Sequence, residues 1–182
     1  IGANGNVGRR TLELLLAEAS QQRAGNGTRL RIVALCNSQR ILWCRRHEAD
    51  ADDLLQRLEA QPPQPQSAER LLEELGSQCF DRLVVVDASA SPDIAALYER
   101  FLSRGIAIVT PNKLANSAGF ENFARLKQVA SHGATPYLYE TTVGAALPVI
   151  KPLLDLRRAG DKPLRVEAVL SGTIAYVLDR IQ

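Results

Sequence analysis

The chain of 182 residues contains no methionine, only two histidines and three cysteines, and almost no net charge. Cys36, Cys44 and Cys79 are odd in number and show neither a CxxC motif nor a Cys/His ligand spacing, which argues against a zinc site or a disulfide framework. The 22 basic and 20 acidic residues give a formal net charge of +2, which leaves no electrostatic footprint for nucleic acid or a membrane surface. We therefore expect reduced thiols, a small-molecule partner, and neither a nucleic-acid nor a membrane partner.

Long hydrophobic runs are absent as well. No segment reaches the roughly 18 to 20 apolar residues that cross a bilayer, and no basic and apolar leader precedes the first glycine. A cytoplasmic location is the resulting prediction. The missing initiator Met and the apolar pattern of the last segment predict that both ends of the chain are trimmed. With 46% hydrophobic residues, the chain can still bury the core of one domain and part of a second.

The apolar pattern alternates between short β-branched runs and segments of helical spacing. A helix is expected over 7–19, because its apolar residues recur every three to four positions. Buried strands are expected within 29–38, 82–91, 105–113 and 135–144, with helices at 93–102 and 120–131. Residues 48–78 predict two exposed amphipathic helices joined by a Pro/Gln-rich linker. Strands separated by helices of this length predict an α/β fold with a Rossmann-type doubly wound parallel sheet.

The pattern changes after Pro148. An amphipathic helix closed by Gly160 and a strand over 164–173 predict the start of an α+β domain for substrate binding and dimerisation. We therefore divide the chain into a dinucleotide-binding domain at residues 1–140 and a partial second domain at 141–182.

The opening sequence IGANGNVGRR places glycines at the N-terminus of the first helix. Unpaired backbone N–H groups and the positive end of the helix dipole favour a pyrophosphate at such a loop. The hexad that matches the dinucleotide fingerprint G-x-G-x-x-G is Ala3-Asn4-Gly5-Asn6-Val7-Gly8, in which Ala3 replaces the first glycine. The middle and last glycines matter most for phosphate approach and helix packing, so a dinucleotide site is predicted. The alternative is a glycine-rich turn without a ligand.

The strand within 29–38 ends in Asn37-Ser38-Gln39-Arg40, where an NAD-binding domain would carry an acidic residue for the ribose hydroxyls. Without a carboxylate to repel it, a 2′-phosphate can pair with Arg40 and accept a hydrogen bond from Ser38. NADP(H) is therefore predicted as the preferred cofactor, with NAD(H) as the alternative. In the competing interpretation, Arg40 belongs to a solvated loop with Arg45 and Arg46.

Polar residues also follow the next two predicted strands. Ser89 and Ser91 come after VVVDA, and Lys113 follows the strand within 105–113. Open α/β sheets bind ligands outside the carboxyl ends of their strands, so these positions predict contacts with cofactor or substrate. Lys113 can equally be an ordinary surface charge.

No nucleophile with an activating partner is visible. His47 and His132 have neither a Ser/Cys partner pattern nor a metal spacing and are expected to be solvated, and Cys36 and Cys79 are expected to be packing thiols. The absence of a reactive cysteine argues against a semialdehyde dehydrogenase that forms a thiohemiacetal.

Taken in order, NGNVGRRTLELL, LCNSQR, VVVDASAS, IVTPNKLAN, YLYETTVGAALPVI and LSGTIAYVLDRI resemble homoserine dehydrogenase. The similarity is to the dehydrogenase half of bifunctional aspartokinase–homoserine dehydrogenases, and it spans nearly the whole chain apart from residues 48–78. The resemblance implies reversible NADP(H)-linked interconversion of aspartate 4-semialdehyde and homoserine, a step toward threonine and methionine. It also implies a homodimer, and it raises the question whether an aspartokinase domain precedes Ile1.

The resemblance assigns roles to individual residues. It implies that the loop at Gly5–Gly8 holds the cofactor pyrophosphate and that Arg40 lies near the adenosine end. It further implies that Ser89 lies beside the nicotinamide, that Lys113 lies at the junction of cofactor and substrate, and that Thr173 lines the substrate pocket.

A monovalent-cation site is implied in the same way. Its ligands would be the carboxylate of Glu140 and the backbone carbonyls of Val143, Ala145 and Leu147, and the ion would be sodium. Oxygen ligands suit such a hard cation. The alternative for Glu140 is an ordinary carboxylate at the end of a strand.

Two departures from the family pattern bear on function. Ala146 replaces a glycine of the common VGAGLP sequence, and an alanine there would strain the loop if that position required a positive φ. The family's catalytic lysine is expected beyond Gln182. Two other functions therefore remain open: a non-catalytic NADP-binding relative, and an oxidoreductase of the same architecture that acts on another small aldehyde.

Overall fold

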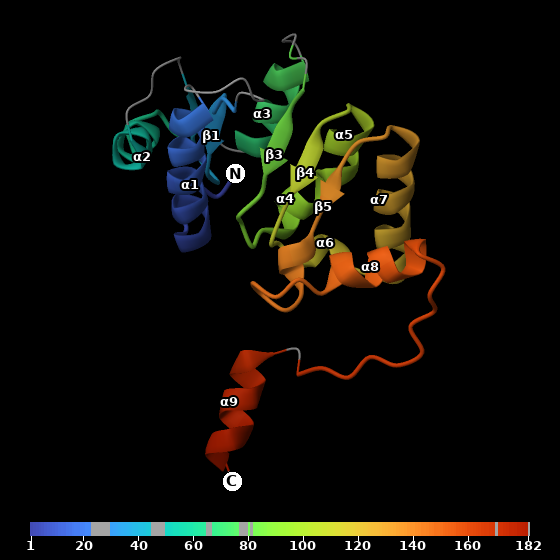
Figure 1. Ribbon diagram of the computed structural model, residues 1–182. Coiled ribbons are helices and arrows are strands. Elements are labelled where there is room, and N and C mark those ends of the chain that lie inside the picture. The colour runs from blue at the N-terminus through green and yellow to red at the C-terminus, as the bar shows by residue number, and fades with distance from the viewer. Residues whose placement is uncertain are drawn as a thin grey trace.

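The structure is a computed structural model that describes residues 1–22, 30–44, 50–64, 67–76, 80, 82–169 and 171–181 (Figure 1). The strands are β1 (Ala34–Cys36), β2 (Ile41–Trp43), β3 (Val84–Val86), β4 (Ala107–Val109) and β5 (Tyr137–Leu138). The helices are α1 (Asn6–Gln22), α2 (Ala51–Glu59), α3 (Ser67–Gly76), α4 (Pro92–Ala96), α5 (Tyr98–Ser103), α6 (Leu114–Ser117), α7 (Phe120–His132), α8 (Ile150–Arg158) and α9 (Gly172–Ile181), and η1 (Glu140–Thr142) is a 3₁₀ turn. The predictions for Arg45, Arg46, His47 and Cys79 fall outside the described residues.

Two small sheets are joined by the first residues of the chain. β3, β4 and β5 form a parallel sheet in that order, and β1 pairs with β2 in an antiparallel hairpin. The N-terminal ammonium of Ile1 donates to the Val86 carbonyl (2.7 Å), and the Ala88 N–H donates to the Ile1 carbonyl (3.0 Å). The Gly2 N–H donates to the Cys36 carbonyl (2.8 Å). Ile1 and Gly2 therefore lie between β1 and β3 and place both sheets in one layer.

Helices cover both faces of this layer, as the doubly wound prediction required. Leu35 of β1 and Leu42 of β2 pack with α1 and α2, whereas Cys36 and Ile41 belong to the larger core with α3, α5 and α7. Successive residues of a strand point to opposite faces, so this division means that each face buries its own apolar set. The α/β class with a parallel sheet is confirmed.

The strand β2 is absent from the sequence-based prediction, which ended the strand within 29–38 at Asn37–Arg40 and expected no further strand before residue 48. The Asn37 N–H donates to the Arg40 carbonyl (3.1 Å), and the Asn37 side chain accepts the N–H groups of Gln39 (2.9 Å) and Arg40 (2.8 Å). Asparagine stabilises tight turns in this way. The turn reverses the chain, and ILW pairs back along β1.

The two helices within 48–78 are amphipathic, but the prediction that they are exposed is wrong. Leu54 and Leu58 of α2 and Leu72 of α3 are fully buried. Their spacing puts one apolar stripe on each helix, and each stripe covers one face of the β1–β2 hairpin. The predicted helix at 93–102 is divided in two, because a one-residue break at Leu97 separates α4 from α5.

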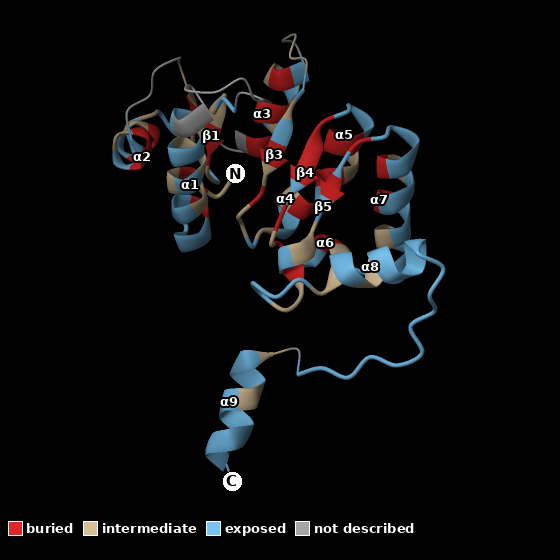
Figure 2. Cartoon of the chain, in the orientation of Figure 1, coloured by how far each residue is buried: buried red, intermediate tan, exposed pale blue. Residues whose placement is uncertain are grey.

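The C-terminal part differs most from the prediction. No strand forms within residues 161–169, where Val166 and Val169 are exposed, because a strand needs a hydrogen-bonding partner and this described segment has none. The predicted helix closed by Gly160 is present as α8. Figure 2 shows that α8 and α9 are largely exposed, and Figure 1 shows α9 apart from the other elements.

Within the described ranges of the chain, no helix combines the length and the hydropathy that crossing a bilayer requires.

Candidate functional site

The glycine loop is built around Gly2, whose φ of +74° lies in the left-handed region. A Cβ at Gly2 would lie 2.9 Å from the Ser89 nitrogen, so the loop and the segment after β3 are in direct backbone contact. The left-handed residue precedes the matched hexad, and Ala3 has an ordinary φ and is buried in the core beneath α1. This explains why alanine is accepted at the position where the fingerprint has its first glycine.

Gly5 and Gly8 have different roles in the loop. A Cβ at Gly8 would lie 2.1 Å from the Gly2 carbonyl oxygen, so only glycine lets α1 pack on the loop. A Cβ at Gly5 would have only the Gly2 oxygen nearby, at 3.5 Å, and its other surroundings are open. Among the described residues, no acceptor is recorded for the backbone N–H groups of Asn6, Val7 and Gly8. The first turn of α1 therefore offers free donors to an anion.

A buried polar network holds the loops that follow β3 and β4. Asp87 is fully buried and accepts hydrogen bonds from the Tyr98 hydroxyl (2.6 Å), the Asn112 amide (3.1 Å) and the Ser89 N–H (2.8 Å). Asn112 also donates to the Ser91 carbonyl (3.1 Å). The carboxylate thus ties the segment with Ser89 to the segment with Lys113.

The network also has an electrostatic consequence. Burial raises the pKa of the Tyr98 hydroxyl well above its ordinary value, and the negative charge of Asp87 adds to this shift. Tyr98 therefore remains a neutral hydrogen-bond donor. Sequence reasoning did not identify these residues, although an aspartate directly after three valines and the asparagine in TPNK were visible signals.

Ser38 and Arg40 lie in the turn after β1, at the same edge of the layer as the glycine loop. Ser38 is exposed, whereas Arg40 is partly buried and already engaged. Its guanidinium pairs with Glu59 (Nη1 to Oε2, 3.2 Å) and donates from Nε to the Gln61 carbonyl (3.0 Å). Glu59 also accepts a hydrogen bond from the side chain of Asn4 in the glycine loop. A carboxylate that sequence reasoning did not consider therefore lies between the loop and Arg40.

Lys113 and Thr173 are not brought together. Lys113 follows β4 at the start of α6, is exposed, and has no recorded ion partner among the described residues. Thr173 lies in the first turn of α9, which has no buried residue and lies apart from the sheet (Figure 1). The structure therefore groups the glycine loop, Ser89 and Lys113 at one sheet edge, without Thr173.

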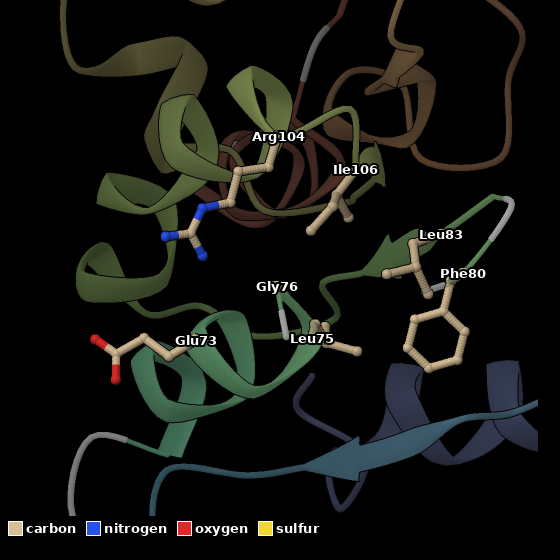
Figure 3. A pocket seen from close by; sticks show the side chains of 7 residues that line it. All are labelled: Glu73, Leu75, Gly76, Phe80, Leu83, Arg104 and Ile106. Carbon is tan, nitrogen blue, oxygen red and sulfur yellow. The ribbon is translucent and has the colours of Figure 1, made fainter. Parts of the chain in front are cut away.

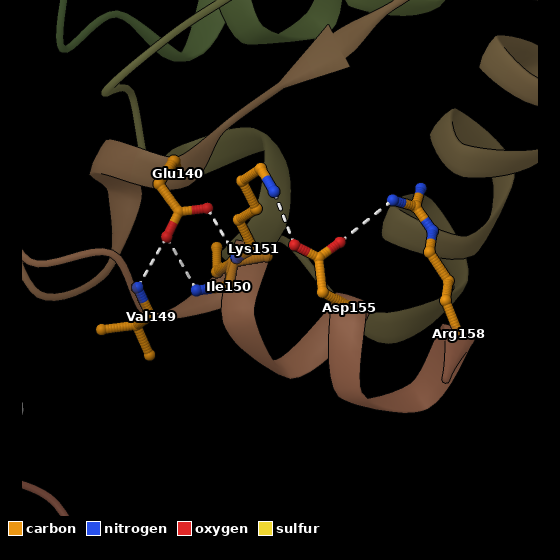
Figure 4. Close-up of polar contacts among 6 residues, drawn as sticks. All are labelled: Glu140, Val149, Ile150, Lys151, Asp155 and Arg158. Atoms are coloured by element: carbon orange, nitrogen blue, oxygen red, sulfur yellow. Dashed lines mark hydrogen bonds and ion pairs between the residues drawn. The ribbon is translucent and has the colours of Figure 1, made fainter. Parts of the chain in front are cut away.

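Glu140 caps a helix. Its Oε1 accepts the N–H groups of Val149 (2.6 Å) and Ile150 (2.8 Å), and its Oε2 accepts that of Lys151 (2.8 Å) (Figure 4). These are N–H groups at the start of α8, where the helix dipole favours an anion. On α8 itself, Lys151 donates to Asp155 (2.5 Å), and this bond lowers the pKa of the Asp155 carboxyl.

The turn that follows Glu140 contains the other predicted cation ligands, Val143, Ala145 and Leu147. Gly144 and Ala145 adopt positive φ values of +70° and +50°. Ala146, which replaces the family's glycine, does not have a positive φ, so this replacement causes no backbone strain. The strained alanine is the preceding residue, Ala145.

A pocket lies elsewhere and is not part of this site. It is lined in part by Leu83, Arg104 and Ile106 (Figure 3). Leu83 and Ile106 immediately precede β3 and β4, so the pocket is at the amino ends of the parallel strands. The glycine loop and the polar network are at the carboxyl ends, where α/β sheets bind their ligands.

A glycine loop that opens a helix, beside the carboxyl ends of parallel strands with helices on both faces, defines a Rossmann-type dinucleotide-binding domain. A family model described as "Homoserine dehydrogenase, NAD binding domain" matches residues 4–140. The chain belongs to the homoserine dehydrogenase family.

Individual relatives agree with this assignment. The chain is 31% identical over 179 residues to bifunctional aspartokinase/homoserine dehydrogenase 1, chloroplastic, of Zea mays, which covers 98% of this chain and 19% of the maize protein. It is 42% identical over 103 residues to a homoserine dehydrogenase of Paracoccidioides brasiliensis (57% of this chain, 28% of that protein). The chain thus spans less than a third of the length of either relative.

A solved structure shows the same fold. A hyperthermophilic archaeal homoserine dehydrogenase mutant in complex with NADPH superposes with a TM-score of 0.60 at 22% identity. The match covers 82% of this chain and 45% of that one.

Proposed function

We propose that the protein carrying this chain is an NADP(H)-dependent oxidoreductase that interconverts L-homoserine and L-aspartate 4-semialdehyde. The observation that carries this proposal is the backbone contact between Gly2 and the segment with Ser89. Because of it, a helix N-terminus with free N–H donors and the loops after β3 and β4 share one edge of the layer. Family membership and the NADPH held by the archaeal relative support a dinucleotide as the ligand of this edge.

In this proposal the described residues bind and align. The N–H groups of Asn6, Val7 and Gly8 receive the pyrophosphate, and Arg40 and Ser38 receive the 2′-phosphate. Ser89 and Lys113 lie beside the nicotinamide and the substrate, and Asp87 fixes the segments that carry them. When bound, the nicotinamide supplies the hydride chemistry. Thr173 stays a predicted substrate contact that requires α9 to approach Lys113.

The test is homoserine-dependent reduction of NADP⁺ and NAD⁺, followed by the absorbance of the reduced nicotinamide in the full-length gene product. Turnover with homoserine, faster with NADP⁺, is the expected result. NADPH binding without turnover on homoserine or other small alcohols would instead identify a non-catalytic relative. Turnover with a different alcohol alone would identify another dehydrogenase of this architecture.

The sodium site stays a separate prediction and has no part in this mechanism. The Glu140 carboxylate already accepts three N–H groups at a helix N-terminus, an environment that favours an anion and repels a cation. Replacing sodium by choline in the homoserine assay tests whether an ion is needed.

A homodimer and a cytoplasmic location are further parts of the proposal. The maize relative is named as a bifunctional, chloroplastic protein. Sedimentation of the full-length gene product tests the dimer.

A further inference from the structure

Glu59 contacts Arg40 of the predicted 2′-phosphate site, and its negative charge has the wrong sign for that ligand. Its carboxylate pairs with the guanidinium of Arg40 at 3.2 Å and also accepts from Asn4. Asn4 belongs to the glycine loop and Arg40 to the turn after β1. The carboxylate therefore bridges the two segments between which the adenosine end of a dinucleotide would lie.

We propose that Glu59 is a specificity-determining residue that limits the preference for NADP(H) by competing with the 2′-phosphate for Arg40. This inference rests on the proposed function, because it presupposes a dinucleotide on the glycine loop. A 2′-phosphate that pairs with Arg40 must displace Glu59 from the guanidinium, and it then carries its negative charge close to that carboxylate. NAD(H) has no such phosphate and meets neither cost.

The exposure of the pair makes this exchange physically reasonable. The Glu59 side chain is 51% exposed and that of Arg40 is 23% exposed. Ion pairs of this kind contribute little to stability, so the carboxylate can move away from Arg40 without loss of the fold. Arg40 stays in place meanwhile, since its Nε donates to the Gln61 carbonyl at 3.0 Å.

The test is the substitution Glu59→Gln, with dissociation constants for NADPH and NADH measured by nicotinamide fluorescence in the full-length gene product. Removing a unit charge a few ångströms from the phosphate should tighten NADPH binding about tenfold at low salt. The dissociation constant for NADH should stay within about twofold of that of the unmodified protein, since NADH lacks the 2′-phosphate on which the removed charge acts. The gain should shrink at high salt, which screens exposed charges.

A matched control is Glu99→Gln. Glu99 forms a comparable exposed ion pair with Arg125 (2.9 Å), but it lies on α5, far along the layer from α2 (Figure 1). This variant should change neither dissociation constant. In an Arg40→Ala background, Glu59→Gln should have a smaller effect, because the competition for Arg40 is removed and only the direct repulsion between the carboxylate and the 2′-phosphate remains.

The outcomes separate the two proposals. An unchanged ratio of NADPH to NADH affinity in Glu59→Gln would overturn the role of Glu59 and leave the proposed function intact. Equal weakening of both cofactors would also overturn it, since it would indicate a contact of Glu59 with the ribose common to both. Failure of the unmodified protein to bind either dinucleotide would overturn the proposed function itself.

Discussion

Substitutions of Gly5 and Gly8, at the N-terminus of α1, should affect different properties. Gly8→Ala should lower the stability of the fold, whereas Gly5→Ala should weaken cofactor binding. In Gly8→Ala the new methyl group would lie 2.1 Å from the Gly2 oxygen and 2.9 Å from the Ala3 Cα. Overpacking costs about 1–3 kcal/mol, and the upper part of this range applies because the opposing atoms are backbone. Alanine recovers about 1 kcal/mol as a better helix former. The free energy of unfolding should fall by about 2 kcal/mol, or about 4–8 °C in melting temperature for a domain of this size.

Gly5→Ala is the matched comparison. Its methyl group meets nothing closer than 3.5 Å, so stability should be unchanged or slightly higher. The methyl group would instead occupy the open side of the loop, and NADPH affinity should fall about tenfold or more because close phosphate approach needs glycine there. Thermal melting by circular dichroism and NADPH titration measure the two quantities. Gly8→Ala with the stability of the unmodified protein would refute the packing of α1 on the loop. Unchanged NADPH binding by Gly5→Ala would refute the placement of the pyrophosphate.

Three further predictions concern single side chains. Arg40→Ala should weaken NADPH binding and leave NADH binding nearly unchanged; equal loss in a fluorescence titration would contradict the 2′-phosphate assignment. Glu140→Ala should cost about 1–2 kcal/mol by removing the cap of α8, seen as faster hydrogen exchange at the Ile150 amide, and unaltered exchange would count against the cap. Burial raises the folded-state pKa of Tyr98 above its ordinary 10.0, so the unfolded chain loses its proton first and stability falls as pH rises above 10. The slope is at most about 1.4 kcal/mol per pH unit for this group, and Tyr98→Phe should flatten it in urea titrations; an unchanged alkaline slope would contradict the assignment.

The parts of the fold that depend on local pattern were predictable. α1, α7 and α8 follow from helical spacing, and each predicted buried run up to β5 contains a strand. β2 was not predictable from propensity alone, because the three residues ILW are too short a run to indicate a strand. They form one because the turn at Asn37 directs them back onto β1, where they pair. The segment after Gly160 has strand-like residues but no partner among the described residues, and pairing is a tertiary property.

The candidate site was predictable where it depends on position along a strand. Ser89 and Lys113 follow strands, so topology alone brings them to the same edge as the glycine loop. The roles of Asp87 and Glu59 depend on side chains far apart in sequence. Asp87 receives hydrogen bonds from Tyr98 and Asn112, and Glu59 reaches Arg40 from the end of α2. No sequence spacing encodes such contacts.

Glu140 lies at the predicted boundary between the domains 1–140 and 141–182, and its side chain makes hydrogen bonds across that boundary. Its carboxylate follows β5 directly, and it binds the first N–H groups of α8. A helix end that loses its cap leaves unsatisfied donors, so separating α8 from β5 would cost the free energy of these bonds. The three hydrogen bonds therefore tie α8 to the end of the parallel sheet, across the predicted division.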